Sequence, residues 1–189
     1  MRHLILAAAL LLAACTGVPG GGLFAPSGTP SLALYDGALT VAGAEAYCVD
    51  TRVSRPASGF AVLASCARTA GARLHPQIDG LVIAQVGEAG SALVAGNEAA
   101  LADVLQSDDG AALMEGTATR VVTGAGTVLV RLQDRETTGA TGAPLWRVFF
   151  DLGDRSVTAT IRPFADVPLD PTAARSVLET TVAAIRAAN

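Results

Sequence analysis

The sequence predicts an α+β domain in which an antiparallel β-sheet is flanked by a middle helix and a C-terminal amphipathic helix. Three observations support this class. Short apolar runs are separated by glycine-containing turn pairs, one middle segment has helical spacing, and a longer amphipathic segment ends the chain. The 189 residues are 51% hydrophobic and 16% charged, which excludes a disordered chain and suits one globular core.

In the first half of the chain, strands are expected over residues 32–41, 46–49, 59–66 and 81–86. The turn signal Asp36-Gly37 interrupts the first of them, and Asp79-Gly80 introduces the last. The second and third are joined by a loop around Pro56, so they can pair antiparallel.

A helix is expected to follow, capped by Asn97 and running through Gln106. Its apolar stripe consists of Ala100, Leu101, Val104 and Leu105. A short helical turn is expected from Asp109 through Met114.

Two hairpins are expected in the second half. The first joins residues 120–123 to 126–133 through Gly124-Ala125, and a polar loop over 134–143 follows it. The second joins 145–152 to 155–163 through Gly153-Asp154. A two-residue turn there places an apolar face across both strands, with Trp146, Val148 and Phe150 opposite Ile161, Ala159 and Val157.

The final helix is expected to begin after its cap Asp170, with Pro171 at the first helical position. Its apolar stripe should lie on the apolar sheet face and consists of Val177, Leu178, Thr181, Val182 and Ile185.

The first 15 residues have the features of an export signal. Arg2 and His3 give a basic start, residues 4–12 form an apolar run, and Ala13-Ala14-Cys15 follows at once. This segment closely resembles the bacterial lipoprotein signal. The resemblance implies cleavage before Cys15 and attachment of fatty acyl chains such as palmitate to Cys15. The alternative is an ordinary secretory signal cut near Ala14, which leaves Cys15 a spare thiol.

A lipidated Cys15 leaves Cys48 and Cys66 of the three cysteines, an even pair in an exported chain, where disulfides persist. We therefore expect a structural Cys48–Cys66 disulfide, and closing a loop of this length stabilises a fold by about 3 kcal/mol. A redox role is not expected, because no C-x-x-C spacing is present.

The expected organisation is a signal peptide over 1–14, the lipidated cysteine and a flexible tether over 15–30, and a globular domain over 31–189. Residues 16–30 contain Gly20-Gly21-Gly22 and three prolines, which is typical of a tether. In lipoproteins of enteric bacteria, Asp after the lipidated cysteine retains the protein in the inner membrane. Thr16 stands there in this chain, so the resemblance implies the periplasmic face of the outer membrane.

The order of the elements, ending in two long strands and an amphipathic helix, is similar to the sandwich of the PsbP-like proteins. The whole chain resembles the small lipoproteins of GC-rich proteobacteria. Neither resemblance includes a catalytic motif, and a fold alone does not define a function.

Composition and motifs exclude several classes. The net charge of −4 argues against nucleic acid as a partner. After residue 14 no apolar run approaches the roughly 20 residues of a membrane span. His75 is the histidine that remains after signal removal, so a zinc site built from several imidazoles is not expected. The chain has no dinucleotide, phosphate or calcium loop motif, and neither a cofactor nor a metal is expected.

Strand parity indicates an arginine-lined sheet face opposite Trp146. Its candidate anion-binding residues are Arg120, Arg131, Arg147 and Arg162. Guanidinium groups bind carboxylates and phosphates bidentately, which suits a small anion, a glycan acid or a lipid headgroup. The alternative is a solvated face whose arginines pair with Asp151 and Asp154.

The leading expectation is a non-enzymatic, lipid-anchored envelope protein that acts as an accessory or binding module of the periplasm. Its partners would be the membrane, through the anchor, and an envelope protein. One alternative is a carrier of a small molecule or anion on the arginine face. The other is a hydrolase that uses His75 with a distant serine and a carboxylate.

Overall fold

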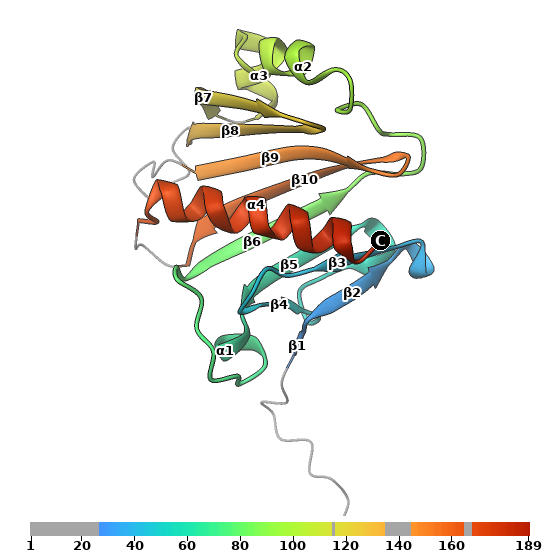
Figure 1. Ribbon diagram of the computed structural model, residues 1–189, viewed down its shortest axis with the longest axis vertical. Helices are drawn as coiled ribbons and strands as arrows, with labels where there is room; N and C mark the ends of the chain where they lie inside the picture. Colours follow the sequence, from blue (N-terminus) through green and yellow to red (C-terminus); the bar gives the residue numbers. More distant parts are fainter. Residues whose placement is uncertain (1–26, 115, 135–144, 165–167) are drawn as a thin grey trace, which may run out of the picture.

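The computed structural model describes residues 27–114, 116–134, 145–164 and 168–189. Within them the chain has a large antiparallel sheet with helices on both faces, which confirms the α+β class (Figure 1). The signal segment, Cys15, most of the expected tether and nearly all of the polar loop over 134–143 lie outside the described residues.

Eight strands form the main sheet, and all neighbouring pairs are antiparallel. In spatial order they are β1 (Gly28–Thr29), β4 (Tyr47–Asp50), β5 (Phe60–Ser65), β6 (Gly80–Val86), β10 (Arg155–Pro163), β9 (Leu145–Leu152), β8 (Thr127–Asp134) and β7 (Gly116–Gly124). Turns with two residues between the paired ends join β7 to β8 and β9 to β10, so each of these pairs is a local hairpin.

One face of the sheet, called here the α4 face, is covered by a helix and a small hairpin. Helix α4 (Pro171–Ala187) lies across the middle of the sheet (Figure 1). Beside it, β2 (Ser31–Leu34) and β3 (Leu39–Ala42) form a separate two-stranded sheet around the 3-10 turn η1 (Tyr35–Gly37). The C-terminal Asn189 joins the two, because its side-chain oxygen accepts from Thr40 N at 2.8 Å and its nitrogen donates to Thr40 O at 2.8 Å.

The main core lies under α4, and it confirms the expected hairpin register. Trp146 pairs with Ile161, Val148 with Ala159 and Phe150 with Val157. The helix begins as expected, because Asp170 Oδ1 accepts from Ala173 N at 2.8 Å. Four residues of the expected helical stripe are buried, namely Leu178, Thr181, Val182 and Ile185, and Val177 packs against the same core.

Two short helices cover the opposite face, called here the α2 face, over β7 and β8. They are α2 (Glu98–Leu105) and α3 (Asp108–Leu113). A second core forms beneath them from Val94, Leu105, Met114, Val128, Val130 and Leu132. The β7–β8 hairpin is thus supported on the α2 face.

Several local expectations need correction. In α2 the buried residues are Ala102 and Leu105, whereas Val104 is 50% exposed, so the helix is rotated relative to the expected stripe. Asn97 precedes α2 without a side-chain cap, because its amide donates to Leu93 O instead. The first hairpin turns at Ala125-Gly126, one residue later than expected, and Gly126 has the left-handed φ of 67° that glycine tolerates.

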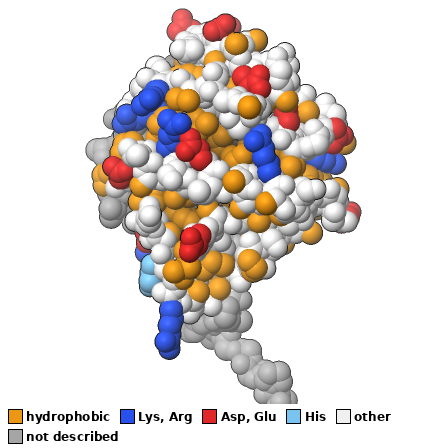
Figure 2. Space-filling view, in the orientation of Figure 1, with side chains coloured by type: hydrophobic (Ala, Val, Ile, Leu, Met, Phe, Trp, Pro, Cys, Tyr) orange, Lys and Arg blue, Asp and Glu red, His pale blue; other side chains and the backbone are white. Residues whose placement is uncertain are grey.

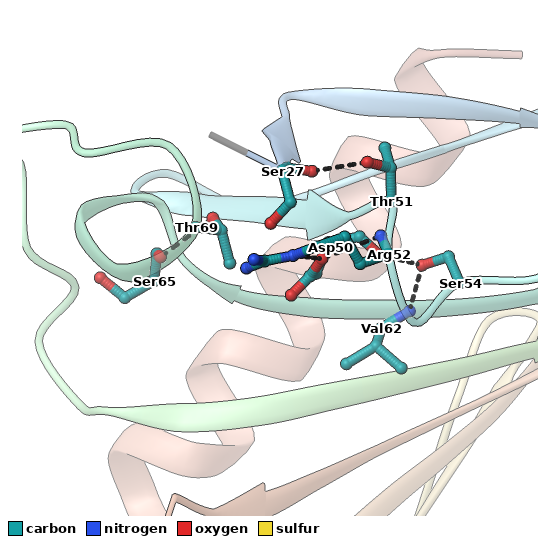
Figure 3. Close-up of polar contacts among 8 residues, drawn as sticks. All are labelled: Ser27, Asp50, Thr51, Arg52, Ser54, Val62, Ser65 and Thr69. Carbon is teal, nitrogen blue, oxygen red and sulfur yellow. Dashed lines mark hydrogen bonds and ion pairs between the residues drawn. The ribbon is translucent and has the colours of Figure 1, made fainter. Parts of the chain in front are cut away.

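The start of the domain also differs from expectation. Gly28 and Thr29, placed in the expected tether, form β1 and pair with Asp50 and Val49. Ser27 N donates to Thr69 O at 2.8 Å, and Ser27 O accepts from both the backbone and the hydroxyl of Thr51 at 2.9 Å (Figure 3). The folded domain therefore includes Ser27.

Beyond Thr51, the turn that leaves β4 is held in the same way. Ser54 Oγ donates to Asp50 O at 2.7 Å and accepts from Val62 N at 3.0 Å (Figure 3). The chain then continues through the 3-10 turn η2 (Pro56–Ser58) into β5. This hydroxyl links the turn after β4 to the neighbouring strand.

The expected disulfide is present. Cys48 in β4 is bonded to Cys66, which begins the short helix α1 (Cys66–Thr69) directly after β5. Helix α1 was not expected from the sequence. Ser65 caps it by accepting from Ala67 N, so the chain turns away from the sheet at the cysteine itself.

Leu178→Ala should lower the free energy of unfolding by about 2–5 kcal/mol, because this side chain is fully buried between α4 and the sheet. Leu113→Ala is the matched control, since it makes the same chemical change at a site that is 80% exposed. We expect that control to stay within about 0.5 kcal/mol of the unchanged protein in urea unfolding. Equal losses in the two variants would contradict the packing of α4.

Candidate functional site

Two rows of side chains cross β7, β8 and β9 on the α4 face. The apolar row consists of Val122, Leu129 and Val148, which are successive cross-strand partners. The arginine row consists of Arg120, Arg131 and Trp146, which are paired in the same way. Within each strand the two members are two residues apart, so both rows face the same side and lie about 7 Å apart.

A groove of ≈ 350 Å³ lies between α4 and these strands. The apolar row and Val182 of α4 line it, together with Arg175, Glu179 and Arg186 from the same helix. Figure 2 shows basic side chains on both sides of an apolar surface in this region. The groove exists because α4 covers β9 and β10 and leaves the outer strands open on this face.

The charged groups on α4 have partners. Arg175 Nε donates to Glu179 Oε1 at 2.8 Å, and its guanidinium lies 5.9 Å from the centre of the Trp146 ring. Arg186 Nη2 donates to Gly126 O at 2.9 Å, and its guanidinium lies 5.5 Å from the Phe150 ring. These two arginines thus frame the groove while bound to neighbouring groups.

The arginine row differs in this respect. Among the described residues, no ion pair or hydrogen bond reaches the guanidinium group of Arg120 or Arg131. Arg131 Nε and Trp146 Nε1 are buried donors without an acceptor in that part of the chain, and each such donor costs about 1–3 kcal/mol. Arg120 lies directly opposite Arg131, and like charges at such positions destabilise a sheet. The row therefore presents donors and positive charge without an acceptor among the described residues.

The structure divides the four arginines predicted to share one face. Arg131 is paired with Trp146, so Arg131 and Arg120 lie on the α4 face. Arg147 and Arg162 lie on the α2 face, where Arg147 is paired with Val130. The predicted single arginine face is therefore wrong, and it is replaced by one pair on each side of the sheet.

The second pair is engaged in other interactions. Arg147 Nε donates to Thr160 Oγ1 at 2.9 Å, and both Arg147 and Arg162 have further partners. The alternative pairing of these arginines with Asp151 or Asp154 is not observed among the described residues. Asp151 accepts the backbone N–H groups of residues 93–95, and Asp154 accepts that of Gly90, so both hold the loop before α2.

The tip of the β7–β8 hairpin is fixed from both faces. Glu98 at the start of α2 accepts from Gly126 N at 2.8 Å, while Arg186 donates to Gly126 O on the other side. Hydrogen bonds from backbone N–H groups, first its own and then those of Gly126 and Gly96, lower the pKa of the Glu98 carboxyl. This carboxylate positions one end of the groove.

The hydrolase alternative depends on His75, which is exposed in the loop after α1. Ser65 and Asp79 line the same pocket as His75. However, Ser65 is 2% exposed and caps α1, and Asp79 is bound by Arg68, whose hydrogen bond lowers the pKa of the Asp79 carboxyl. Ser65 and Asp79 are thus each engaged with a partner other than His75.

Across the described residues, no three His, Cys, Asp or Glu side chains are grouped so that they could hold a metal ion. The helices in those same ranges are all too short or too polar to span a bilayer.

Sequence reasoning missed Arg175 and Arg186 as groove residues. Their spacing of three helical turns places both on one side of α4, next to Glu179 and Val182. That spacing was visible in the sequence. What could not be seen was that the outer hairpin lies beside this side of the helix.

No protein-family model matches this chain, and no curated protein sequence matches it. Among solved structures, the chain is similar to a mutant of the protein Mog1, with a TM-score of 0.48 and 14% sequence identity. The match covers 85% of this chain and 94% of that one.

We expect the Glu98 carboxyl to titrate at lower pH in the folded protein than in the urea-unfolded chain, as followed by carbon NMR of the side-chain carboxyl. Because the folded pKa is lowered, the contribution of this group to stability is present above its ordinary pKa and is lost as the pH falls through the folded value. In the same titration Gly126 N–H should lose its protection from exchange. Identical midpoints in the folded and unfolded chains would contradict the contact.

Proposed function

We propose that this chain is a non-enzymatic, lipid-anchored protein of the bacterial cell envelope, with its folded domain acting as an accessory or binding module on the periplasmic side. The observation that carries the proposal is the pairing of the cysteines. The Cys48–Cys66 disulfide uses two of the three, and the third, Cys15, follows the apolar run and Ala13-Ala14. A disulfide also supports export, because such bonds persist in oxidising compartments.

The position of Cys15 suits an anchor. The fold includes Ser27, so residues 16–26 would separate the acyl chains from the domain. A flexible chain of that length has a root-mean-square reach of about 20 Å. The domain would then lie close to the membrane surface, and Thr16 in place of Asp favours the outer membrane.

The binding role is supported by the groove beside α4. Its walls are apolar, and the arginine row, with its unpaired guanidinium groups, lies beside it on the same sheet face, whereas the surroundings of His75 offer no comparable set for catalysis. The partner under this proposal is an envelope component that reaches the groove. An envelope protein is the leading partner, and carriage of a small anion is the second candidate, favoured by the buried donors of the arginine row.

Cys15→Ala should abolish incorporation of an alkyne-tagged fatty acid and shift the protein out of the membrane fraction. The physical reason is that the acyl chains supply the membrane affinity, at about 0.8 kcal/mol per buried CH₂. Cells expressing the variant and the unchanged chain are labelled, fractionated and compared by blotting.

The matched control is the Cys48→Ala, Cys66→Ala double variant, which removes both disulfide cysteines and keeps Cys15. We expect this variant to retain the label, while its free energy of unfolding falls by about 2–5 kcal/mol. Labelling that survives in Cys15→Ala would sink the lipoprotein proposal.

A further inference from the structure

We propose that the groove beside α4 binds a single-chain anionic amphiphile. Its hydrocarbon chain would lie along the apolar row in the groove, and its oxyanion head would extend beyond the groove lining onto Arg120 and Arg131 of the neighbouring arginine row. The inference rests on the binding role proposed above, but it does not depend on the lipid anchor.

The head is assigned from unsatisfied donors. Arg131 Nε and Trp146 Nε1 belong to cross-strand neighbours, and Trp146 is only 3% exposed. A carboxylate or phosphate oxygen has several lone pairs and can accept from more than one donor, which relieves the cost of burying both. It would also offset the repulsion between Arg120 and Arg131, which are directly opposed across the strands.

The neighbouring charges leave this role to the arginine row. Glu179 is paired with Arg175, and Arg186 is bound to Gly126 O. Glu98 faces the other side of the hairpin and accepts from Gly126 N. Among the described residues, none of these carboxylates is bonded to Arg120 or Arg131, so an incoming anion would meet two uncompensated guanidinium groups.

The chain is assigned from what adjoins those groups. Val122 lies two residues after Arg120, Leu129 two before Arg131, and Val148 two after Trp146, so the apolar row runs alongside the arginine row. Val182 closes the groove from α4, and the volume of ≈ 350 Å³ is within the range of small-molecule sites. The apolar row lies about 7 Å from the two opposed arginines, Arg120 and Arg131. This spacing suits a ligand with a charged head and an apolar chain.

Tryptophan fluorescence provides a local readout, because Trp146 is the one tryptophan in the sequence. The full chain in its unlipidated Cys15→Ala form is titrated, below micelle concentrations, with sodium palmitate and with lysophosphatidylglycerol. The comparison probes are neutral monopalmitoylglycerol and inorganic phosphate. We expect a saturable emission change with at least one anionic amphiphile, and binding at least about tenfold weaker for both comparison probes.

Variants test the assigned residues. Arg120→Gln and Arg131→Gln should each weaken binding of the anionic amphiphile by about tenfold, because each removes one charge-assisted contact. Arg73→Gln is the matched control, an identical change at an exposed arginine in the loop after α1, and it should leave the affinity unchanged. Circular dichroism checks folding, and the exposed Arg120 keeps the test valid if Arg131→Gln proves unstable.

The outcomes separate the alternatives. Palmitate alone would identify a free fatty acid as the ligand, and lysophosphatidylglycerol alone a phospholipid headgroup; either supports the proposal. Equal binding of the neutral lipid, saturable binding of phosphate alone, no binding of either amphiphile, or unchanged affinity in both arginine variants would overturn it. None of these results alters the fractionation of Cys15→Ala, so failure here and failure of the anchor are distinguishable.

Discussion

The packing of α4 against β9 and β10 is the contact on which the rest of the structure depends. It buries the apolar side of the helix on a sheet face where the β9–β10 turn sets the register of the two strands. Its extent also determines the groove. A single helix about 10 Å across, flanked by the β2–β3 hairpin, covers only part of an eight-stranded sheet, so the outer strands stay open beside it.

Those outer strands can face the groove because they are packed from behind. Val121, Val128 and Val130 point into the second core under α2 and α3, while the alternate residues of the same strands form the two rows on the α4 face. Glu98 and Arg186 fix the hairpin tip from opposite sides. The core on the α2 face thus stabilises β7 and β8. Positively charged residues can therefore lie on the α4 face of these strands without loss of the strand pairing.

The sequence predicted correctly those elements whose position depends on neighbouring residues in the chain. The β9–β10 register followed from one short turn, and α4 from its cap and stripe, and both are confirmed. The prediction of a single arginine face was wrong because β8 and β9 are joined by a long segment. No short turn fixes the register of this pair, so the sequence does not show which residues of β8 lie on the same face as Trp146 of β9. β1 was missed because two residues carry no periodic signal, and they pair only through β4.

The bonds at Ser27 have a mechanical consequence. Tension on the chain at this point would pass into Thr51, after β4, and into Thr69, at the end of α1. The Cys48–Cys66 disulfide joins those two elements covalently. A pull from the amino-terminal side is therefore shared by a closed loop of chain, and it cannot peel β4 away from α1 without breaking a covalent bond. The two-residue edge strand β1 is therefore backed by a covalently closed loop.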